Sequence, residues 1–199
     1  MRSASVIANP FGTSGSKLCW DCPAMCCTHL EPPLLTAEDT VEISLVSGRQ
    51  PPDFSRPTDY GSRVGLRQVL AQPSGACIFL GPNRRCTIYE HRPLDCMLYP
   101  LDLRVIEGRL HWIVYALMAE GRDCPLEKHP RLSQAIHWTE RHILPRLRSD
   151  ELITIATETQ PSFSLYREGN WRQLREVDLA FCSPGLRHDV ELELQRLKE

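Results

Sequence analysis

Four cysteines lie within nine residues near the start of this chain, in the stretch CWDCPAMCC, and three more follow far along the sequence in CIFLGPNRRCTIYEHRPLDC. Thiolates are the ligands that zinc and iron–sulfur clusters prefer in proteins. Isolated buried cysteines are common in packed cores, but a core does not explain thiols this crowded. The two segments therefore predict a single metal-binding region to which both contribute.

The total of nine cysteines favours ligation over disulfide pairing, because an odd number cannot pair completely. The N-terminal segment lacks the apolar stretch of a secretory signal, and the longest apolar run, WIVYALMA, is far shorter than the roughly 20 residues that span a bilayer. We therefore expect a cytoplasmic protein with no membrane partner, in a compartment that keeps thiols reduced. A net charge of −2 gives no reason to expect a nucleic-acid partner.

Local sequence signals predict an α+β fold. LTAEDTVEISLVSG predicts a helix over residues 37–47, because Thr36 is a suitable N-cap and Gly48 a suitable residue to end it. ACIFLG and RCTIYE each predict a short strand, and LDLRVIEGRLHWIVYALM predicts a hairpin that turns at EGR. The proline-rich residues 49–62 predict a loop, and RPLDCMLYP predicts one helical turn.

The order of these signals predicts two parts. Residues 1–34 show no helical or strand period, so we expect an irregular arm at the start. With the short strands and the hairpin it forms a small, irregular, cysteine-rich metal-binding domain over residues 1–128. Helical spacing dominates the remainder, which predicts a helical extension over residues 129–199 that packs on this domain.

The cysteine spacing indicates how the ligands divide. Cys19 and Cys22 form a C-x2-C pair, whose tight turn places both sulfurs on one side of the chain. Cys26 and Cys27 are adjacent, and in an extended segment their side chains point to opposite faces. These two sulfurs then serve two neighbouring metals or opposite sides of one cluster. Joining the two cysteine segments costs on the order of 3–4 kcal/mol plus a constant, and structural zinc supplies an apparent ~10–16 kcal/mol, so metal binding offsets the cost.

Several familiar metal sites are not matched. A zinc finger needs a second C-x2-C, which is absent, or an H-x3-5-H, for which the chain offers His137 and His142, two residues that do not share a face of the predicted helix. The ferredoxin run C-x2-C-x2-C-x3-C is absent as well. A radical enzyme built on C-x3-C-x2-C needs a cysteine where His29 stands. Either His29 is a ligand or proton donor beside the cysteine pair, or it is a solvated loop residue.

The whole pattern resembles a cysteine-cluster family of zinc- or iron-chelating domains that includes relatives of flagellin lysine N-methylase. The resemblance runs from about residue 19 to 127, through C-x2-C-x3-C-C, LTAEDT, CIFL, C-x-IY-E-x-RP-x-x-C and YP. It implies a further ligand after the hairpin, where family members tend to carry Cys-Pro-Gly. This chain has Cys124 there, in DCPLE, with leucine in place of the glycine.

Eight cysteines are thus the predicted metal ligands: Cys19, Cys22, Cys26, Cys27, Cys77, Cys86, Cys96 and Cys124. Reduced structural thiols are the alternative, and we expect that role for Cys182, which lies outside the resemblance. Arg92, in the RP of the pattern, either donates hydrogen bonds to cluster sulfur or to a carbonyl, or pairs with Glu90 or Asp95. Tyr89 and Tyr99 either cover the metal or pack in the core.

Eight thiolates divide into two sets of four, which suits two zinc ions, two [4Fe–4S] clusters, or one cluster with spare thiols. Adjacent cysteines favour an iron–sulfur cluster, with [4Fe–4S] preferred and zinc as the alternative, since zinc sites usually show separate paired knuckles. The predicted function is a metal-binding protein with a structural or redox role. The alternatives are a cluster-containing protein N-methyltransferase-like enzyme, which the resemblance implies, and a metal trafficking or sensing protein.

The sequence leaves open whether the chain is an enzyme. It has no G-x-G-x-x-G and no recognisable S-adenosylmethionine-binding loop, which counts against methyl transfer. The protein partner or substrate is not identified by any motif.

The ligand assignment makes a prediction about stability. Serine in place of Cys22, Cys26, Cys77 or Cys86 is expected to destabilise the whole fold, because metal binding and folding share one free energy. Cys182→Ser is the control and is expected to leave the fold intact. Thermal unfolding of the five variants checks this, and equal tolerance at all five positions would refute the site.

Overall fold

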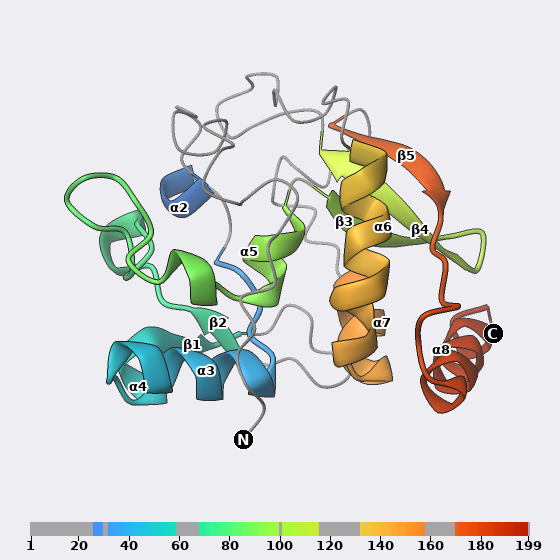
Figure 1. Cartoon of the computed structure of the whole chain (residues 1–199), viewed down its shortest axis with the longest axis horizontal. Coiled ribbons are helices and arrows are strands. Elements are labelled where there is room, and N and C mark those ends of the chain that lie inside the picture. Colours follow the sequence, from blue (N-terminus) through green and yellow to red (C-terminus); the bar gives the residue numbers. More distant parts are fainter. Residues whose placement is uncertain are drawn as a thin grey trace.

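Helices and two small antiparallel sheets build the computed structural model in Figure 1, which confirms the α+β class. Residues 26–99 carry most of the short elements and are called the cysteine lobe, and residues 101–198 carry the three-stranded sheet and are called the sheet lobe. The two lobes lie on the left and right of Figure 1. The structure describes residues 26–29, 32–58, 68–99, 101–115, 132–157 and 170–198.

The first long helix, α3 (Ala37–Ser47), begins and ends where the sequence predicts. The Thr36 hydroxyl accepts a hydrogen bond from the Asp39 N–H at 3.0 Å, and the Asp39 carboxylate accepts one from the Thr36 N–H at 2.9 Å. This reciprocal pair is a capping box, which satisfies backbone donors that a helix start leaves free. Gly48 ends the helix at φ 68°, in the left-handed region that glycine enters without steric cost.

Short elements complete the cysteine lobe: α2 (Cys26–His29), α4 (Pro51–Phe54), β1 (Ser55–Pro57), β2 (Gln68–Leu70), the 3-10 turns η1 (Pro73–Gly75) and η2 (Tyr89–His91), and α5 (Leu94–Leu98). The helical turn predicted in RPLDCMLYP is confirmed as α5. The loop predicted over residues 49–62 is wrong in part, since α4 and β1 lie within it. Pro51 is tolerated in α4 because it stands at the helix start, where its missing N–H has no intrahelical partner to lose.

The two strands predicted in ACIFLG and RCTIYE are wrong. Where they were expected the described chain has one isolated bridge, between Leu80 and Cys86. The two segments share the hydrogen bonds of a short turn, from the Gly81 N–H to the Arg85 carbonyl and from the Thr87 N–H to the Phe79 carbonyl, both at 2.8 Å, while other backbone donors turn to sulfur. The Phe79 N–H donates to the sulfur of Cys77 at 3.5 Å, and the Ile88 N–H donates to the sulfur of Cys86.

The hairpin predicted in the middle of the chain is confirmed as β3 (Leu101–Ile106) and β4 (Arg109–Tyr115). Glu107 and Gly108 form its turn, both with positive φ, and a two-residue turn of this kind matches the twist of the strands. A third strand, β5 (Trp171–Glu176), pairs antiparallel with β4 and was not predicted. It is mostly exposed, so it lacks the alternating apolar pattern by which a strand is recognised.

Three longer helices complete the sheet lobe: α6 (Leu132–His142), α7 (Ser149–Thr157) and α8 (Pro184–Arg196). Helices α6 and α7 lie across one face of the sheet, and α8 packs against α7 (Figure 1). Among the helices that the structure describes, none is long and apolar enough to cross a bilayer. The boundary predicted between residues 128 and 129 lies outside the described residues.

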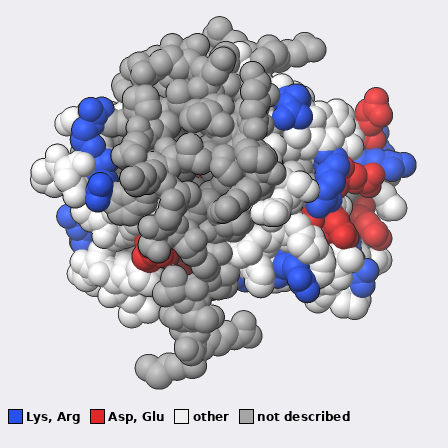
Figure 2. All heavy atoms as spheres, turned by 45° about the horizontal axis from the view of Figure 1, so that its top comes forward, with Lys and Arg blue, Asp and Glu red and all other residues white. Residues whose placement is uncertain are grey.

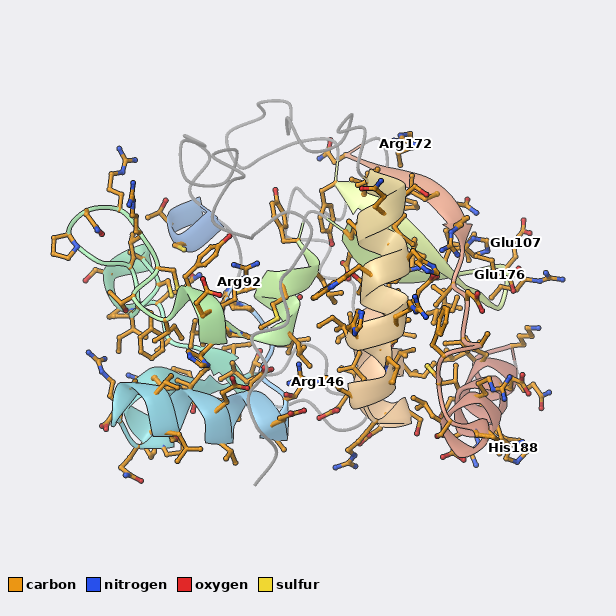
Figure 3. All side chains as sticks on the ribbon, viewed as in Figure 1. Arg92, Glu107, Arg146, Arg172, Glu176 and His188 are labelled. Atoms are coloured by element: carbon orange, nitrogen blue, oxygen red, sulfur yellow. The ribbon has the colours of Figure 1, made fainter. Side chains whose placement is uncertain are left out.

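One apolar core joins the two lobes. Leu103 and Trp112, on facing positions of β3 and β4, are fully buried at its centre. The cysteine lobe contributes Leu34, Val69, Leu94 and Leu98 to the same core. An ion pair at the surface adds to this contact, since Arg146 of the sheet lobe reaches Glu38 at the start of α3, at 2.9 Å (Figure 3).

The cysteine lobe has a smaller core of its own. Its buried members are Leu35, Ile43, Phe54, Leu70, Cys77, Phe79 and Ile88. Two thiols, those of Cys27 and Cys86, pack against this cluster. Of the predicted ligands, Cys77 thus belongs to this apolar core, and Cys27 and Cys86 stand at its edge.

A buried carboxylate ties the sheet to α6. Glu140 is 0% exposed and accepts three hydrogen bonds: from the Trp112 indole at 2.9 Å, from the Asp178 N–H at 2.8 Å and from Arg175 at 2.5 Å. A buried charge is stable when it is paired and its remaining lone pairs are satisfied. Glu140 therefore joins β4, β5 and the segment that follows β5.

Charged side chains of both signs lie close together at the sheet-lobe end of the face in Figure 2. The pair between Arg109 and Glu176, at 3.1 Å, is an exposed example that joins β4 to β5. Exposed pairs of this kind contribute little to stability. They provide a comparison for the buried Glu140.

The buried Glu140 and the exposed Glu176 are expected to differ in their contribution to stability. Glu140→Ala is expected to lower the free energy of unfolding by about 2–3 kcal/mol, because it leaves the buried Trp112 indole N–H and the part-buried Asp178 N–H without an acceptor, whereas Arg175 is 46% exposed and keeps contact with water. Glu176→Ala removes a carboxylate that is 54% exposed and is expected to cost less than about 1 kcal/mol. Urea unfolding of both variants checks the difference, and similar costs would contradict the role of Glu140.

Candidate metal centre

The structure describes the side chains of four of the eight predicted ligands: Cys27, Cys77, Cys86 and Cys96. Three others lie outside the described residues: Cys19, Cys22 and Cys124. Cys26 and His29 belong to α2, but the structure describes only their backbone. The described part of the site therefore comprises the second cysteine segment and the end of the first.

Cys27 and Cys77 bring the two cysteine segments together. The Cys77 N–H donates to the Cys27 carbonyl at 2.7 Å, and the two thiols share a hydrogen bond. Residues 1–34 were expected to form an irregular arm, whereas Cys26 and Cys27 belong to the helical turn α2. Successive side chains of a helix differ in direction by about 100°, rather than pointing to opposite faces.

Cys77 and Cys86 each begin a tight turn that directs a backbone N–H at their own sulfur. The donors are Phe79, at 3.5 Å, and Ile88, each two residues further along the chain. The Leu80 N–H closes the first turn on the Cys77 carbonyl at 2.9 Å. Hydrogen bonds of this kind stabilise the negative charge of a thiolate, which is the form that binds metal.

Cys96 lies on α5, and two carboxylates, one buried and one half-buried, fix that helix. The Asp95 carboxylate accepts the Leu34 N–H at 2.9 Å, and the Asp39 carboxylate accepts the Leu94 N–H at 3.0 Å. The two bonds run in opposite directions between the start of α5 and the chain around the start of α3. The start of α5 therefore cannot shift without breaking both. Sequence reasoning missed this role, although the acidic residue at the start of each helix was a visible signal.

Electrostatic effects link the four described thiols. The hydrogen bond from Cys77 lowers the pKa of Cys27 to about 7 against the opposing effect of burial, and it raises the pKa of Cys77. Burial raises the pKa of Cys86 and of Cys96, and the charge of Cys27 raises both further. A bound cation lowers the pKa of every ligating thiol, because its positive charge favours the thiolate.

Within the described segments, no three cysteine, histidine, aspartate or glutamate side chains are arranged to hold a metal ion by themselves. The donor chemistry nevertheless fits a thiolate-bound metal, since Cys27 and Cys77 are in contact and two sulfurs accept backbone N–H groups. A four-thiolate site built on this pair needs further cysteines. The predicted ligands outside the described residues supply candidates for those positions.

A second buried polar cluster lies on the sheet face opposite the main core, and it was not predicted. The Tyr115 hydroxyl donates to the Asp102 carboxylate, and Arg104 reaches the same hydroxyl at 3.5 Å. Tyr99 stacks on Tyr115 with the ring centres 6.0 Å apart. The charge of Asp102 also helps burial to raise the pKa of Asp95 to about 7, so this cluster lies within electrostatic reach of α5.

Cys182 is buried in the main core, as expected of a structural thiol, and burial raises its pKa. It is not among the charges that act on the four described thiols. Its position makes Cys182→Ser a suitable control for variants of the predicted ligands.

Fold and donor set together define a cysteine-rich metal-binding domain. Residues 18–125 match the family CxxCxxCC, described as "Putative zinc- or iron-chelating domain", and this chain belongs to that family. The family name has two residues between its second and third cysteines, whereas this chain has three, Pro23, Ala24 and Met25. No curated protein and no solved structure matches the chain, so a relation to flagellin lysine N-methylase stays a prediction.

The carboxylate that holds α5 makes a pH prediction. Burial raises the pKa of Asp39 to about 6 from the 3.8 that applies when the chain is unfolded. Between these values the folded chain binds a proton that the unfolded chain does not, so the contribution of Asp39 to stability rises as the pH falls. Asp39→Asn cannot titrate, and the natural chain is expected to gain about 1 kcal/mol relative to it between about pH 7 and pH 5.

Urea unfolding of the two chains at both pH values, with equal metal content, measures this difference. An unchanged difference in the free energy of unfolding would show that Asp39 ionises normally in the folded chain.

Proposed function

We propose that this chain is a metal-binding protein whose cysteines hold an iron–sulfur cluster, with [4Fe–4S] favoured over zinc, and that the centre has a structural or redox role. The observation that carries the proposal is the contact between Cys27 and Cys77, which joins two cysteine segments far apart in the sequence. Membership of a zinc- or iron-chelating family supports metal binding in general.

Three features favour a cluster over separate zinc ions. The four described thiols are carried by α2, by two tight turns and by α5, and a cluster can accept ligands from several elements. Two sulfurs accept backbone N–H groups, and such bonds set the reduction potential of iron–sulfur centres. The adjacent pair Cys26 and Cys27 is unlike the separated knuckles of a zinc site.

A structural role follows from the size of the cysteine-lobe core. Among the residues that the structure describes, that core has seven buried members, of which Cys77 is a predicted ligand, and two further predicted ligands, Cys27 and Cys86, pack against it, whereas the main core lies mostly in the sheet lobe. A ligand set that spans both cysteine segments stabilises the lobe by closing a long loop in the folded chain. A redox role follows from burial and N–H···S bonding, which favour a cluster that changes charge without losing its ligands.

Anaerobic purification of the whole chain, followed by elemental analysis and an ultraviolet–visible spectrum, tests the proposal. We expect a brown protein with iron, sulfide and broad absorbance near ~400 nm. Cys77→Ser is expected to lose this absorbance, and Cys182→Ser is expected to keep it. Colourless protein with about two zinc ions would favour the zinc alternative. Purified chain without bound metal, and with no uptake on reconstitution, would contradict metal binding altogether.

A further inference from the structure

Arg92 lies between two of the predicted ligands in the sequence and beside α5 in space (Figure 3). It directly follows η2 and precedes Pro93, which stands at the start of the helix that carries Cys96. Its guanidinium carbon lies 4.1 Å from the centre of the Tyr89 ring, and one terminal nitrogen donates to the Tyr89 carbonyl at 3.5 Å. Contacts with Tyr89, three residues earlier, therefore hold the Arg92 side chain in place.

One hydrogen-bond donor of the Arg92 side chain lacks an acceptor among the described residues. The Nε of Arg92 is buried and has no hydrogen-bond partner among the residues that the structure describes. A buried N–H without an acceptor is costly, and native proteins rarely leave a guanidinium donor in that state. An unsatisfied buried donor therefore points to an acceptor that belongs to the site.

The positive charge of Arg92 acts on the cysteines. It lowers the pKa of Cys86 and of Cys96, against the effects of burial and of the neighbouring thiols. Arginine stays protonated at every relevant pH, so this charge is permanent. A centre ligated by four thiolates carries net negative charge, which a nearby guanidinium compensates.

We propose that Arg92 donates its Nε–H to a sulfur of the bound metal centre and supplies the permanent positive charge that stabilises that centre. The inference rests on the proposed function and deepens it. A sulfur acceptor would satisfy the buried donor, and the ring and carbonyl of Tyr89 hold the guanidinium in place. Arg92 is a positioning residue of the site and not a ligand.

The test uses Zn²⁺ and Co²⁺ on the whole chain, stripped of metal under anaerobic conditions, because thiolate sites accept both ions. Arg92→Gln removes the charge, and Arg92→Lys keeps it without the Nε donor. Arg49→Gln is the matched control, since Arg49 is exposed and lies over the ring of Phe79 in the same lobe, at 5.5 Å. Competition with a chelator measures Zn²⁺ affinity, and the thiolate-to-Co²⁺ absorption reports directly on the sulfurs.

Arg92→Gln is expected to bind Zn²⁺ about 10–100-fold more weakly, as for other residues that support metal ligands, and Arg92→Lys is expected to recover part of that loss. In both variants the thiolate-to-Co²⁺ band is expected to move to lower energy, because a hydrogen bond to sulfur stabilises its lone pair. Arg49→Gln is expected to match the natural chain in both measurements. A merely structural role for Arg92 would not move this band.

Unchanged affinity and an unchanged Co²⁺ spectrum in Arg92→Gln would overturn the inference and leave the proposed function standing. If Arg92→Gln does not fold, the band position in Arg92→Lys decides the question by itself, because lysine lacks the Nε donor. A natural chain that binds neither ion through its cysteines would overturn the proposed function and this inference together. In protein isolated with an iron–sulfur cluster, a lower reduction potential in Arg92→Gln is the equivalent result.

Discussion

Two carboxylates in the first turns of α3 and α5 hold the arrangement on which the rest of the structure depends. Asp39 caps α3 and binds the start of α5, and Asp95 binds back to the segment before α3. These bonds fix the helix that carries Cys96 and place Leu94 beside Leu34 in the main core. The cysteine site and the core of the protein are thus positioned by the same few hydrogen bonds.

Local signals in the sequence predicted some elements well. The capping residues around α3 and the turn of the β3–β4 hairpin act within a few residues, so sequence alone located both. The strands expected around Cys77 and Cys86 are reduced to one isolated bridge, and sulfur, which no propensity scale treats as an acceptor, takes the backbone donors of Phe79 and Ile88. Strand β5 was missed because its pairing with β4 depends on contacts far along the chain.

The candidate site, like the fold, was predicted from the sequence only in part. Thiol crowding was enough to predict that the two cysteine segments meet, and the contact of Cys27 with Cys77 agrees with this prediction. The supporting carboxylates were not predicted, because their roles depend on which backbone N–H groups packing brings to them. Arg92 was singled out from sequence with two alternatives, and its position over Tyr89 became clear only from the three-dimensional arrangement.

The pairing of β5 with β4 has a consequence for how the family is delimited. The family match ends at residue 125, yet the strands before that point rest on α6, α7 and β5, which all come after it. A piece cut at residue 125 would bare one edge of β4 and the apolar face around Trp112, and exposed strand edges of this kind invite aggregation. The stretch that defines the family by sequence is therefore shorter than the stretch that has to fold together.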